Sequence, residues 1–504
     1  MRRGHPSPGR AAIARARVPS QTANPILSAR RPAQSGADCT VDEMRSTQLD
    51  AAKALRGPIV RMMRIHIVDP SAYTPPYDHA LCTALGLTGA EVTLFTSRFT
   101  YGPVPPAEAY RRREMFYRRA HAAAGRGGIA ASRLGGPGAA NAASSLRSRR
   151  AKALKLAEHL PDMLRYRAIS SQADVIHFQW LPVQALDWML LPRRAGGGGP
   201  RASRCAAPLL ITAHDVMPHE PLPLQLTAQR LLYRHLDAVV VHSHHGRDRL
   251  VHELQVPAER VHVIPHGIFE HLRGGRALAE GESAARQRSG GRRGPVVLLF
   301  GLLRPYKGID VLLAAWRMLS EQERMGGELW IAGMPRMDLH PFQLQRGAHW
   351  LGQGPPPPTE PPPPEGVRIA PRFIGDDELA LWFEAADIVV LPYLEADQSG
   401  VLSTALAFGK PLLLTDVGGF PEIAARGAAS IVPAGEPHAL AGQLRLLLAD
   451  PARREQLSAA ARRLSEPGGP LSWSTIAEAH LELYQRLRGP GQALRRHIGG
   501  CGPR

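Results

Sequence analysis

The residues between two predicted strands would suit a phosphate group. The apolar run Ile388–Leu391 predicts a strand buried on both faces, and Leu412–Thr415 predicts a second one. Between them, Val401–Phe408 contains no helix breaker and predicts a helix, which Ser399 and Gly400 precede. Unpaired N–H groups and the positive dipole end at a helix N-terminus favour an anion. The sequence therefore predicts a phosphate-binding site at Ser399 and Gly400.

Two cations upstream strengthen this interpretation. Arg304 and Lys307 follow the predicted strand Val296–Phe300 and the glycine that ends it, Gly301. Two positive charges in such a loop can neutralise a diphosphate while it becomes a leaving group. As ordinary surface cations they would oppose the dipole of the helix predicted at Ile309–Leu319, so a phosphate ligand accounts for them better.

The elements that must position these residues alternate between strands and helices. The short apolar strands predicted earlier in the chain are Ile65–Val68, Val92–Thr96, Val175–Phe178, Leu209–Thr212, Ala238–Val241 and Val261–Ile264. A strand, a helix and a strand within about 30 residues form a βαβ unit with parallel strands. Ligands bind at the carboxyl ends of such strands, so two domains in tandem predict a site between them. The predicted fold class is α/β, with two Rossmann-like domains that face a cleft.

These motifs resemble those of a known family. Phe300-Gly301 with Arg304 and Lys307-Gly308, followed by the stretch Asp387–Glu422, resembles the C-terminal half of a GT-B glycosyltransferase. The Gln-Ser-Gly pattern at 398–400 is similar to a subgroup of the retaining family 4, the glycosyl transferases group 1. The resemblance covers residues 64–488 of the sequence. It implies transfer of a sugar from a nucleotide-diphosphate sugar to an acceptor hydroxyl, with retention and without a metal or other cofactor.

The resemblance implies a donor-binding set in the second half of the chain, comprising Gly301, Arg304, Lys307, Asp397, Gln398, Ser399, Gly400, Thr404, Gly419 and Glu422. Two features depart from the family pattern. Leu302 replaces an arginine that often follows the glycine, and Ala396 and Thr404 replace two glutamates of the cleft-facing helix. Asp397 is then expected to contact the donor sugar, with Glu395 as an alternative, and Thr404 is expected to reach the ribose.

The first domain supplies the predicted catalytic and acceptor-side groups. The family often has His-x-His at a strand end, where this chain has His177-Phe178-Gln179, and His214 with Asp215 ends the next strand. The predicted catalytic residues are His214, His177 and Asp215. The predicted acceptor-side residues are Tyr73, Tyr77, Asp78 and Gln179, although a rigid proline turn is the alternative for the loop at 70–77. Histidines 242, 244 and 245 lack carboxylates or cysteines at ligand spacing, so no metal site is predicted.

The predicted domain boundaries follow composition and the resemblance. Residues 1–61 lack periodicity and predict a disordered basic extension, with the hypothesis that the functional protein begins near Met62. An N-terminal acceptor-side domain is expected at 62–265, with a basic Ala/Gly-rich segment at 103–150, and a linker at 266–294. A nucleotide-sugar domain is expected at 295–470, with a Pro-rich insertion at 352–366. A helix at 471–490 would return to the first domain, and a tail would occupy 491–504.

Positive charge is concentrated in two segments of the chain. The formal net charge is +18; Met1–Arg61 holds 11 Lys/Arg and 4 Asp/Glu, and Ala107–Lys155 holds 12 and 2, so together they contribute 17 of these charges. A basic fold that binds nucleic acid is therefore not predicted. The second segment would suit peripheral contact with an anionic membrane that carries a lipid-linked acceptor, or it is a solvated loop.

Cysteine usage and hydropathy favour the cytoplasm, including the inner face of the membrane. The four cysteines are scattered without paired spacing, so no disulfide framework or zinc motif is predicted. No apolar run approaches the roughly 20 residues that cross a bilayer, and the arginine-rich N-terminus has no apolar core of a secretory signal.

Two other functions remain compatible with the sequence. The missing glutamates and Gln179 would also fit a non-catalytic protein that binds sugar nucleotides. A nucleotide-sugar epimerase with the same fold is the other alternative. The expected partners in the main interpretation are a nucleotide-sugar donor and a saccharide or lipid-linked acceptor.

Overall fold

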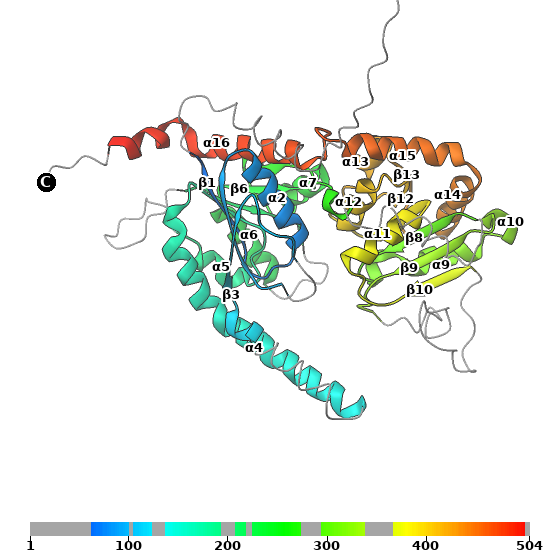
Figure 1. Ribbon diagram of the computed structural model, residues 1–504, viewed down its shortest axis with the longest axis horizontal. Coiled ribbons are helices and arrows are strands. Elements are labelled where there is room, and N and C mark those ends of the chain that lie inside the picture. The colour runs from blue at the N-terminus through cyan, green and yellow to red at the C-terminus, as the bar shows by residue number, and fades with distance from the viewer. Residues whose placement is uncertain are drawn as a thin grey trace, which may run out of the picture. The chain divides into compact units, whose positions relative to one another are not determined.

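The computed structural model describes residues 62–99, 104–122, 137–192, 207–217, 224–273, 294–337 and 366–498. These residues form two parallel sheets, each flanked by helices (Figure 1). The strand orders are β3-β2-β1-β4-β5-β6-β7 and β10-β9-β8-β11-β12-β13. The predicted α/β fold with two Rossmann-like domains is confirmed. The predictions for residues 1–61, and almost all of the Pro-rich insertion, lie outside the described residues.

The first sheet consists of β1 (Arg64–Asp69), β2 (Glu91–Ser97), β3 (Arg111–Phe116), β4 (Val175–Phe178), β5 (Leu209–Thr212), β6 (Ala238–Val241) and β7 (Val261–Val263). Its central strands β4, β5 and β6 are buried at every position. Helices cover both faces of a parallel sheet, which is why these strands are continuous apolar runs rather than alternating ones.

Strand β3 was not predicted from the sequence. Its arginines were assigned to a basic surface segment, but they pair with β2 at the edge of the sheet, with Arg113 opposite Phe95. The guanidinium of Arg113 lies 5.4 Å from the centre of the Phe95 ring. An edge strand with mostly exposed side chains has no apolar pattern, so periodicity could not reveal it.

The helices of the first domain are α2 (Pro75–Leu87), α4 (Pro137–Ile169), α5 (Gln184–Leu190), α6 (Gln225–His235) and α7 (His244–His252), with 3₁₀ turns η1 (Ser170–Gln172), η2 (Ala258–Arg260) and η3 (Glu270–Arg273). The sequence predicted only the second half of α4, from Leu154 onward. Its first half lies in an Ala/Gly-rich stretch with little apolar periodicity, where no helix was expected.

The second sheet consists of β8 (Val296–Phe300), β9 (Glu328–Ala332), β10 (Val367–Ala370), β11 (Ile388–Leu391), β12 (Leu412–Thr415) and β13 (Ala429–Val432). Its helical elements are η5 (Pro305–Lys307), α9 (Ile309–Arg317), α10 (Glu321–Arg324), α11 (Asp376–Ala385), α12 (Gly400–Ala407), α13 (Phe420–Ala425), α14 (Pro437–Ala449) and α15 (Pro451–Ser465). The units β8-α9-β9 and β11-α12-β12 bring the loops after β8 and β11 to the same edge, because β8 and β11 are neighbours.

The last helix, α16 (Trp473–Ile498), packs against α2 of the first domain (Figure 1). The Tyr484 hydroxyl lies 2.7 Å from His177 Nδ1 in β4, and the Trp473 indole N–H donates to the Ile268 carbonyl. The Ile268 N–H donates in turn to the Leu471 carbonyl at 3.1 Å. Residues 266–273 of the expected linker are therefore packed rather than free.

Candidate functional site

Lys307 lies at the carboxyl edge of the second sheet, in η5 after β8. Gly308, with φ 65°, then turns the chain into α9, and a Cβ there would lie 1.9 Å from the Pro392 carbonyl oxygen. The close approach requires glycine, and it brings the end of β11 against the Lys307 loop. Lys307 Nζ donates to the Tyr393 hydroxyl at 2.7 Å and lies 4.6 Å from the centre of that ring.

The ammonium of Lys307 is placed for an anionic ligand. Its side chain is buried, and burial lowers its pKa to about 8, with the Arg304 charge contributing to the fall. An isolated buried cation is costly, and an opposite charge nearby offsets that cost. Arg304 is exposed and supplies a second positive charge in the same loop.

Ser399 and Gly400 begin α12 beside this lysine. The Ser399 hydroxyl caps the helix by accepting from the Leu402 N–H at 3.4 Å, and it lies 3.3 Å from the Tyr393 hydroxyl. Tyr393 thus connects Lys307 with the helix N-terminus. A Cβ at Gly301 would lie 3.0 Å from Lys307 Nζ, so this glycine leaves room for the ammonium. The predicted phosphate-binding residues are brought together at one edge.

Other predicted donor residues have partners within the protein. The Thr404 hydroxyl donates to the Gly400 carbonyl at 2.9 Å within α12, so its hydrogen is used locally. Glu422 in α13 accepts from the His245 N–H at 3.3 Å, and a Cβ at Gly419 would lie 2.9 Å from the Ser243 side chain. Glu422 and Gly419 therefore lie where the two domains touch.

Gln398 differs from these residues. Its side-chain oxygen is buried and has no hydrogen-bond partner among the described residues. A buried acceptor without a donor is costly, so a donor group of a ligand would relieve that cost.

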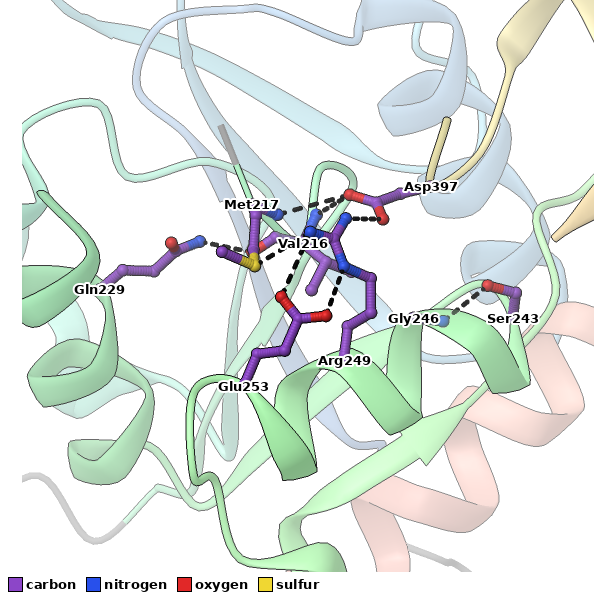
Figure 2. A network of polar contacts seen from close by, with 8 residues as sticks. All are labelled: Val216, Met217, Gln229, Ser243, Gly246, Arg249, Glu253 and Asp397. Atoms are coloured by element: carbon purple, nitrogen blue, oxygen red, sulfur yellow. Dashed lines mark hydrogen bonds and ion pairs between the residues drawn. The ribbon is translucent and has the colours of Figure 1, made fainter. Parts of the chain in front are cut away.

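Asp397 is held by the first domain rather than directed at a donor sugar. Its carboxylate accepts from the Val216 N–H at 2.8 Å and from the Met217 N–H at 3.4 Å (Figure 2). Arg249 of α7 donates to the same carboxylate at 2.8 Å and is fixed by Glu253. This corrects the expectation for Asp397, because two N–H groups and a guanidinium already occupy its oxygens.

The loop that holds Asp397 is itself fixed. Gln229 of α6 donates to the Val216 carbonyl at 2.8 Å, while the Val216 N–H donates to Asp397 (Figure 2). Both polar groups of the Val216 backbone are therefore held in place. Next to Val216, Asp215 is exposed at the carboxyl end of β5. The predicted catalytic Asp215 and the Asp397 contact therefore share one loop.

His214 is buried at the carboxyl edge of the first sheet. Its Nε2 lies 3.1 Å from the Gln179 side-chain oxygen, and its Nδ1 lies 3.2 Å from Nε2 of His242. The imidazole stacks on Trp180, with 5.2 Å between the ring centres, and makes an edge-to-face contact with the Tyr77 ring. Burial holds the pKa of His214 well below its usual range, so the ring is neutral near pH 7.

His177 has a structural environment. Its Nδ1 lies 2.7 Å from the Tyr484 hydroxyl and its Nε2 lies 2.8 Å from the Thr212 hydroxyl, so both ring nitrogens are engaged. The side chain is fully buried, and burial keeps its pKa well below the usual value. The prediction that His177 is catalytic is therefore revised: it joins β4 and β5 to α16.

The predicted acceptor-side residues separate into exposed and buried ones. Tyr73 is 60% exposed and meets the edge of the Trp180 ring. Tyr77 is buried among the rings of three histidines and a tryptophan. Asp78 is buried in the first turn of α2, where burial and then the adjacent Asp69 raise its pKa well above the usual value. Tyr73 is thus the member of this set that a ligand can reach from solvent.

Sequence reasoning missed several residues that organise these two edges. Tyr393 follows a strand end, a position that could have drawn attention. His242 was considered only as a metal ligand, and His266, whose Nδ1 lies 2.9 Å from the Ser403 hydroxyl, only as part of a domain boundary. Arg249 gave no local signal, because its partner Asp397 is distant in the sequence.

The described residues include no group of three or more His, Cys, Asp or Glu side chains arranged to hold a metal ion. In the same residues, none of the helices combines the length and the apolar character that a membrane crossing requires.

Two parts of the chain match known sequence families. Residues 294–450 match the family described as "Glycosyl transferases group 1", and residues 76–267 match the "Glycosyl transferase 4-like domain". The chain belongs to the group 1 glycosyltransferases with the GT-B fold. The two matches include every strand described above except β1, which precedes the first match.

The D-inositol 3-phosphate glycosyltransferase of Streptomyces avermitilis is 30% identical to this glycosyltransferase over 270 residues, which are 52% of this chain and 54% of that relative. A relative with the same description from Catenulispora acidiphila is 30% identical over 272 residues, 52% of this chain and 60% of that protein. The chain thus spans a little over half the length of these curated relatives.

Solved structures support the fold of the glycosyltransferase. Sucrose-phosphate synthase from Thermosynechococcus elongatus superposes with a TM-score of 0.58 at 19% identity, covering 84% of this chain and 99% of that one. The Anabaena protein Alr3699/HepE in complex with UDP-glucose gives 0.57 at 14% identity, with the same coverage.

Proposed function

We propose that this glycosyltransferase moves a sugar from a nucleoside diphosphate sugar to an acceptor hydroxyl, with retention and without a metal ion. The observation that carries the proposal is the hydrogen-bonded series Lys307, Tyr393 and Ser399, which ends at the N-terminus of α12. A buried ammonium, an exposed guanidinium and a helix N-terminus at one sheet edge suit a diphosphate.

These groups would act mainly on the leaving group. As the bond between the anomeric carbon and the β-phosphate oxygen breaks, negative charge grows on the diphosphate next to Lys307 and Arg304. The acceptor oxygen forms the new bond to the anomeric carbon, and its proton passes to a diphosphate oxygen. No strong protein base is required in this scheme, which fits the neutral, buried state of His214.

UDP-glucose is the first donor to test, because a structural neighbour is described in complex with it. In this proposal residues 295–470 bind the donor and residues 62–265 bind the acceptor, a saccharide or a lipid-linked saccharide. His214 and Gln179 of the first domain would face the donor sugar, with Asp215 and Tyr73 as the exposed groups nearest the acceptor.

Thermal unfolding of the full chain with UDP, UDP-glucose and other nucleoside diphosphate sugars tests the donor site. A ligand that binds the native state raises the melting temperature. We expect a selective rise with one nucleotide, and its loss in Lys307→Met. A rise of equal size in Lys307→Met would refute the phosphate assignment.

Two alternatives are separated by turnover. A nucleotide-binding protein without catalysis is favoured by Asp397, which is engaged with the first domain in place of a donor sugar. It would bind a nucleotide sugar but release no nucleoside diphosphate with any saccharide acceptor. An epimerase would convert the donor without an acceptor, whereas transfer requires one.

A membrane contact is proposed for the cytoplasmic leaflet. The exposed side chains of Leu156, Leu160 and Leu164 recur every four residues along α4, so they share one face. Exposed arginines lie on α4 and β3: Arg165, Arg111 and Arg113. Exposed apolar side chains on a helix, together with exposed arginines in the same domain, would suit an anionic bilayer surface.

Sedimentation with vesicles tests this contact. Binding to vesicles with anionic phosphatidylglycerol should exceed binding to neutral phosphatidylcholine, and replacing the three leucines with serine should abolish it. Leu446→Ser on α14, which is also exposed, is the matched control. Binding that survives the triple substitution would contradict the proposal.

A further inference from the structure

Three polar side chains follow one another across the carboxyl edge of the first sheet. Gln179 follows β4, His214 follows β5 and His242 follows β6, and these strands are neighbours in that order. Gln179 Oε1 lies 3.1 Å from His214 Nε2, and His214 Nδ1 lies 3.2 Å from His242 Nε2. The series ends where His242 Nδ1 lies 3.0 Å from the carbonyl oxygen of Ile264, just after β7.

The Ile264 carbonyl sets the direction of this series. A carbonyl oxygen only accepts hydrogen bonds, so the His242 Nδ1 must carry the hydrogen. Burial lowers the pKa of His242 to about 3, so its ring is neutral and has one N–H. Its Nε2 is therefore an acceptor, and it faces His214 Nδ1.

The same reasoning applies to the next ring. His214 is also neutral, so donation from its Nδ1 to His242 leaves its Nε2 as an acceptor. An Oε1 atom at 3.1 Å would place two acceptors face to face. The other amide atom, Gln179 Nε2, is buried and has no partner among the described residues. A half-turn of the amide lets Nε2 donate to His214 Nε2, and it moves Oε1 to the place where the unpaired nitrogen had been.

We propose that His242 is a positioning residue which, anchored on the Ile264 carbonyl, fixes the Nδ1–H tautomer of His214 and turns the Gln179 amide. The amide then presents its oxygen, which accepts a hydrogen bond, to the ligand. The group it selects is a hydroxyl that donates, as a sugar hydroxyl does. If the hydrogen bonds ran the other way, with His242 Nε2 donating to His214, then His242 Nδ1 would carry no hydrogen. The Ile264 carbonyl would then face an acceptor and lose its hydrogen-bond donor.

The tautomer part of this inference stands without any substrate, whereas the selection of a hydroxyl rests on the proposed function. Binding without a donated hydroxyl leaves the Gln179 oxygen unpaired, and an unpaired buried acceptor is costly. A donor sugar that lacks the matching hydroxyl should therefore bind and react less well than its parent.

The first test is nitrogen NMR of the full chain with ¹⁵N-labelled histidine. Comparison with His214→Asn assigns the His214 ring signals, and the wild type should show a protonated Nδ1 and a bare Nε2. The opposite pattern in the wild type, with Nε2 protonated, would overturn the proposal directly.

Two substitutions at position 242 sharpen the test. His242→Gln places an amide oxygen near the Nε2 position, so the Nδ1–H tautomer of His214 should persist. His242→Asn keeps a donor for Ile264 but does not reach His214, so the tautomer should shift toward Nε2–H. The exposed His252→Asn serves as the control and should leave His214 unchanged. Identical His214 signals in His242→Asn and the wild type would contradict the positioning role.

Kinetics with parent and deoxy donor sugars complete the experiment. In His242→Asn, kcat/KM for the parent sugar should fall at least tenfold, while the preference over the matching deoxy sugar disappears; His242→Gln should restore both. Tautomer shifts without turnover of any sugar would support the positioning of His214 and refute the proposed transfer reaction. An undiminished preference in His242→Asn would refute the selection of the hydroxyl.

Discussion

The carboxyl edges of the two sheets differ in the chemistry they offer. The edge of the first sheet carries the imidazoles of His214, His242 and His266, whose pKa values burial lowers, so they act as neutral hydrogen-bonding groups. The edge of the second sheet carries the cations of Lys307 and Arg304 beside the N-terminus of α12. Neutral directional groups suit an uncharged sugar, and cations suit a diphosphate. In the proposed reaction the same strand-helix architecture would therefore serve two ligand parts, because different residues end its strands.

The largest effect on activity is expected from substitution of Lys307. Lys307→Met removes the buried charge while keeping most of the side-chain volume, so kcat/KM should fall by about 10²–10³, in line with the loss of one stabilising group in a site of this kind. Stability should not fall, because the substitution also removes the cost of burying an ammonium. Steady-state kinetics and thermal unfolding measure both effects.

Lys410→Met is the matched control, since Lys410 precedes β12 and so lies toward the amino end of the same sheet. Its kcat/KM should remain within a factor of about two of the wild type. A similar loss of activity in both variants would mean that the cationic edge has no special role.

Gly308→Ala should disrupt the second edge through the backbone. The new Cβ would lie 1.9 Å from the Pro392 carbonyl at a φ of 65°, so the Lys307 loop must move, at a cost above about 2 kcal/mol. Gly442→Ala in α14 meets nothing within 4 Å and should stabilise the chain by about 0.5–1 kcal/mol. Denaturant unfolding measures both, and equal effects would show that the close approach at Gly308 is unimportant.

Loss of the Arg249–Asp397 contact between the two edges should have a smaller effect than the changes at Lys307 and Gly308. Arg249→Met and Asp397→Asn each break a partly buried ion pair and should destabilise the chain by about 1–3 kcal/mol, with a smaller loss in the double variant than the sum of both. A double-mutant cycle measures that coupling. Arg111→Met in the exposed pair with Glu91 should cost under about 0.5 kcal/mol. Additive losses at Arg249 and Asp397 would argue against a direct interaction.

The smallest effect is expected from pH. Lys307 has a pKa of about 8, and a diphosphate favours its charged form, so nucleotide affinity should be full below pH 8 and fall up to about tenfold per unit above it. Unfolded lysine stays protonated to a higher pH, so the burial cost is also largest below pH 8 and declines as pH rises. Titration of UDP by calorimetry should give a pH profile that is steeper in the wild type than in Lys307→Met.

The sequence alone determined the features that depend on neighbouring residues. Apolar runs, the Gly301 and Gly308 positions and the Ser399-Gly400 pair are local signals, so they predicted β8, β11 and α12 and pointed to a candidate phosphate site. Phe300-Gly301 with Arg304 and Lys307-Gly308, together with the stretch Asp387–Glu422, also allowed the family to be recognised before any tertiary contact was known. Strand β3 escaped prediction because edge pairing with β2 left its arginines exposed.

Tertiary structure alone decided which partner each polar group has. His177 and His214 both end strands of the first sheet and looked equivalent in the sequence. Packing of α16 gave His177 the Tyr484 hydroxyl, whereas the neighbouring strand β6 gave His214 the imidazole of His242. Asp397 looked like a donor ligand, yet its oxygens meet Arg249 of the first domain. Hydrogen bonds depend on distance and direction in space, and residues far apart in the chain acquire these only when the sheets and helices pack.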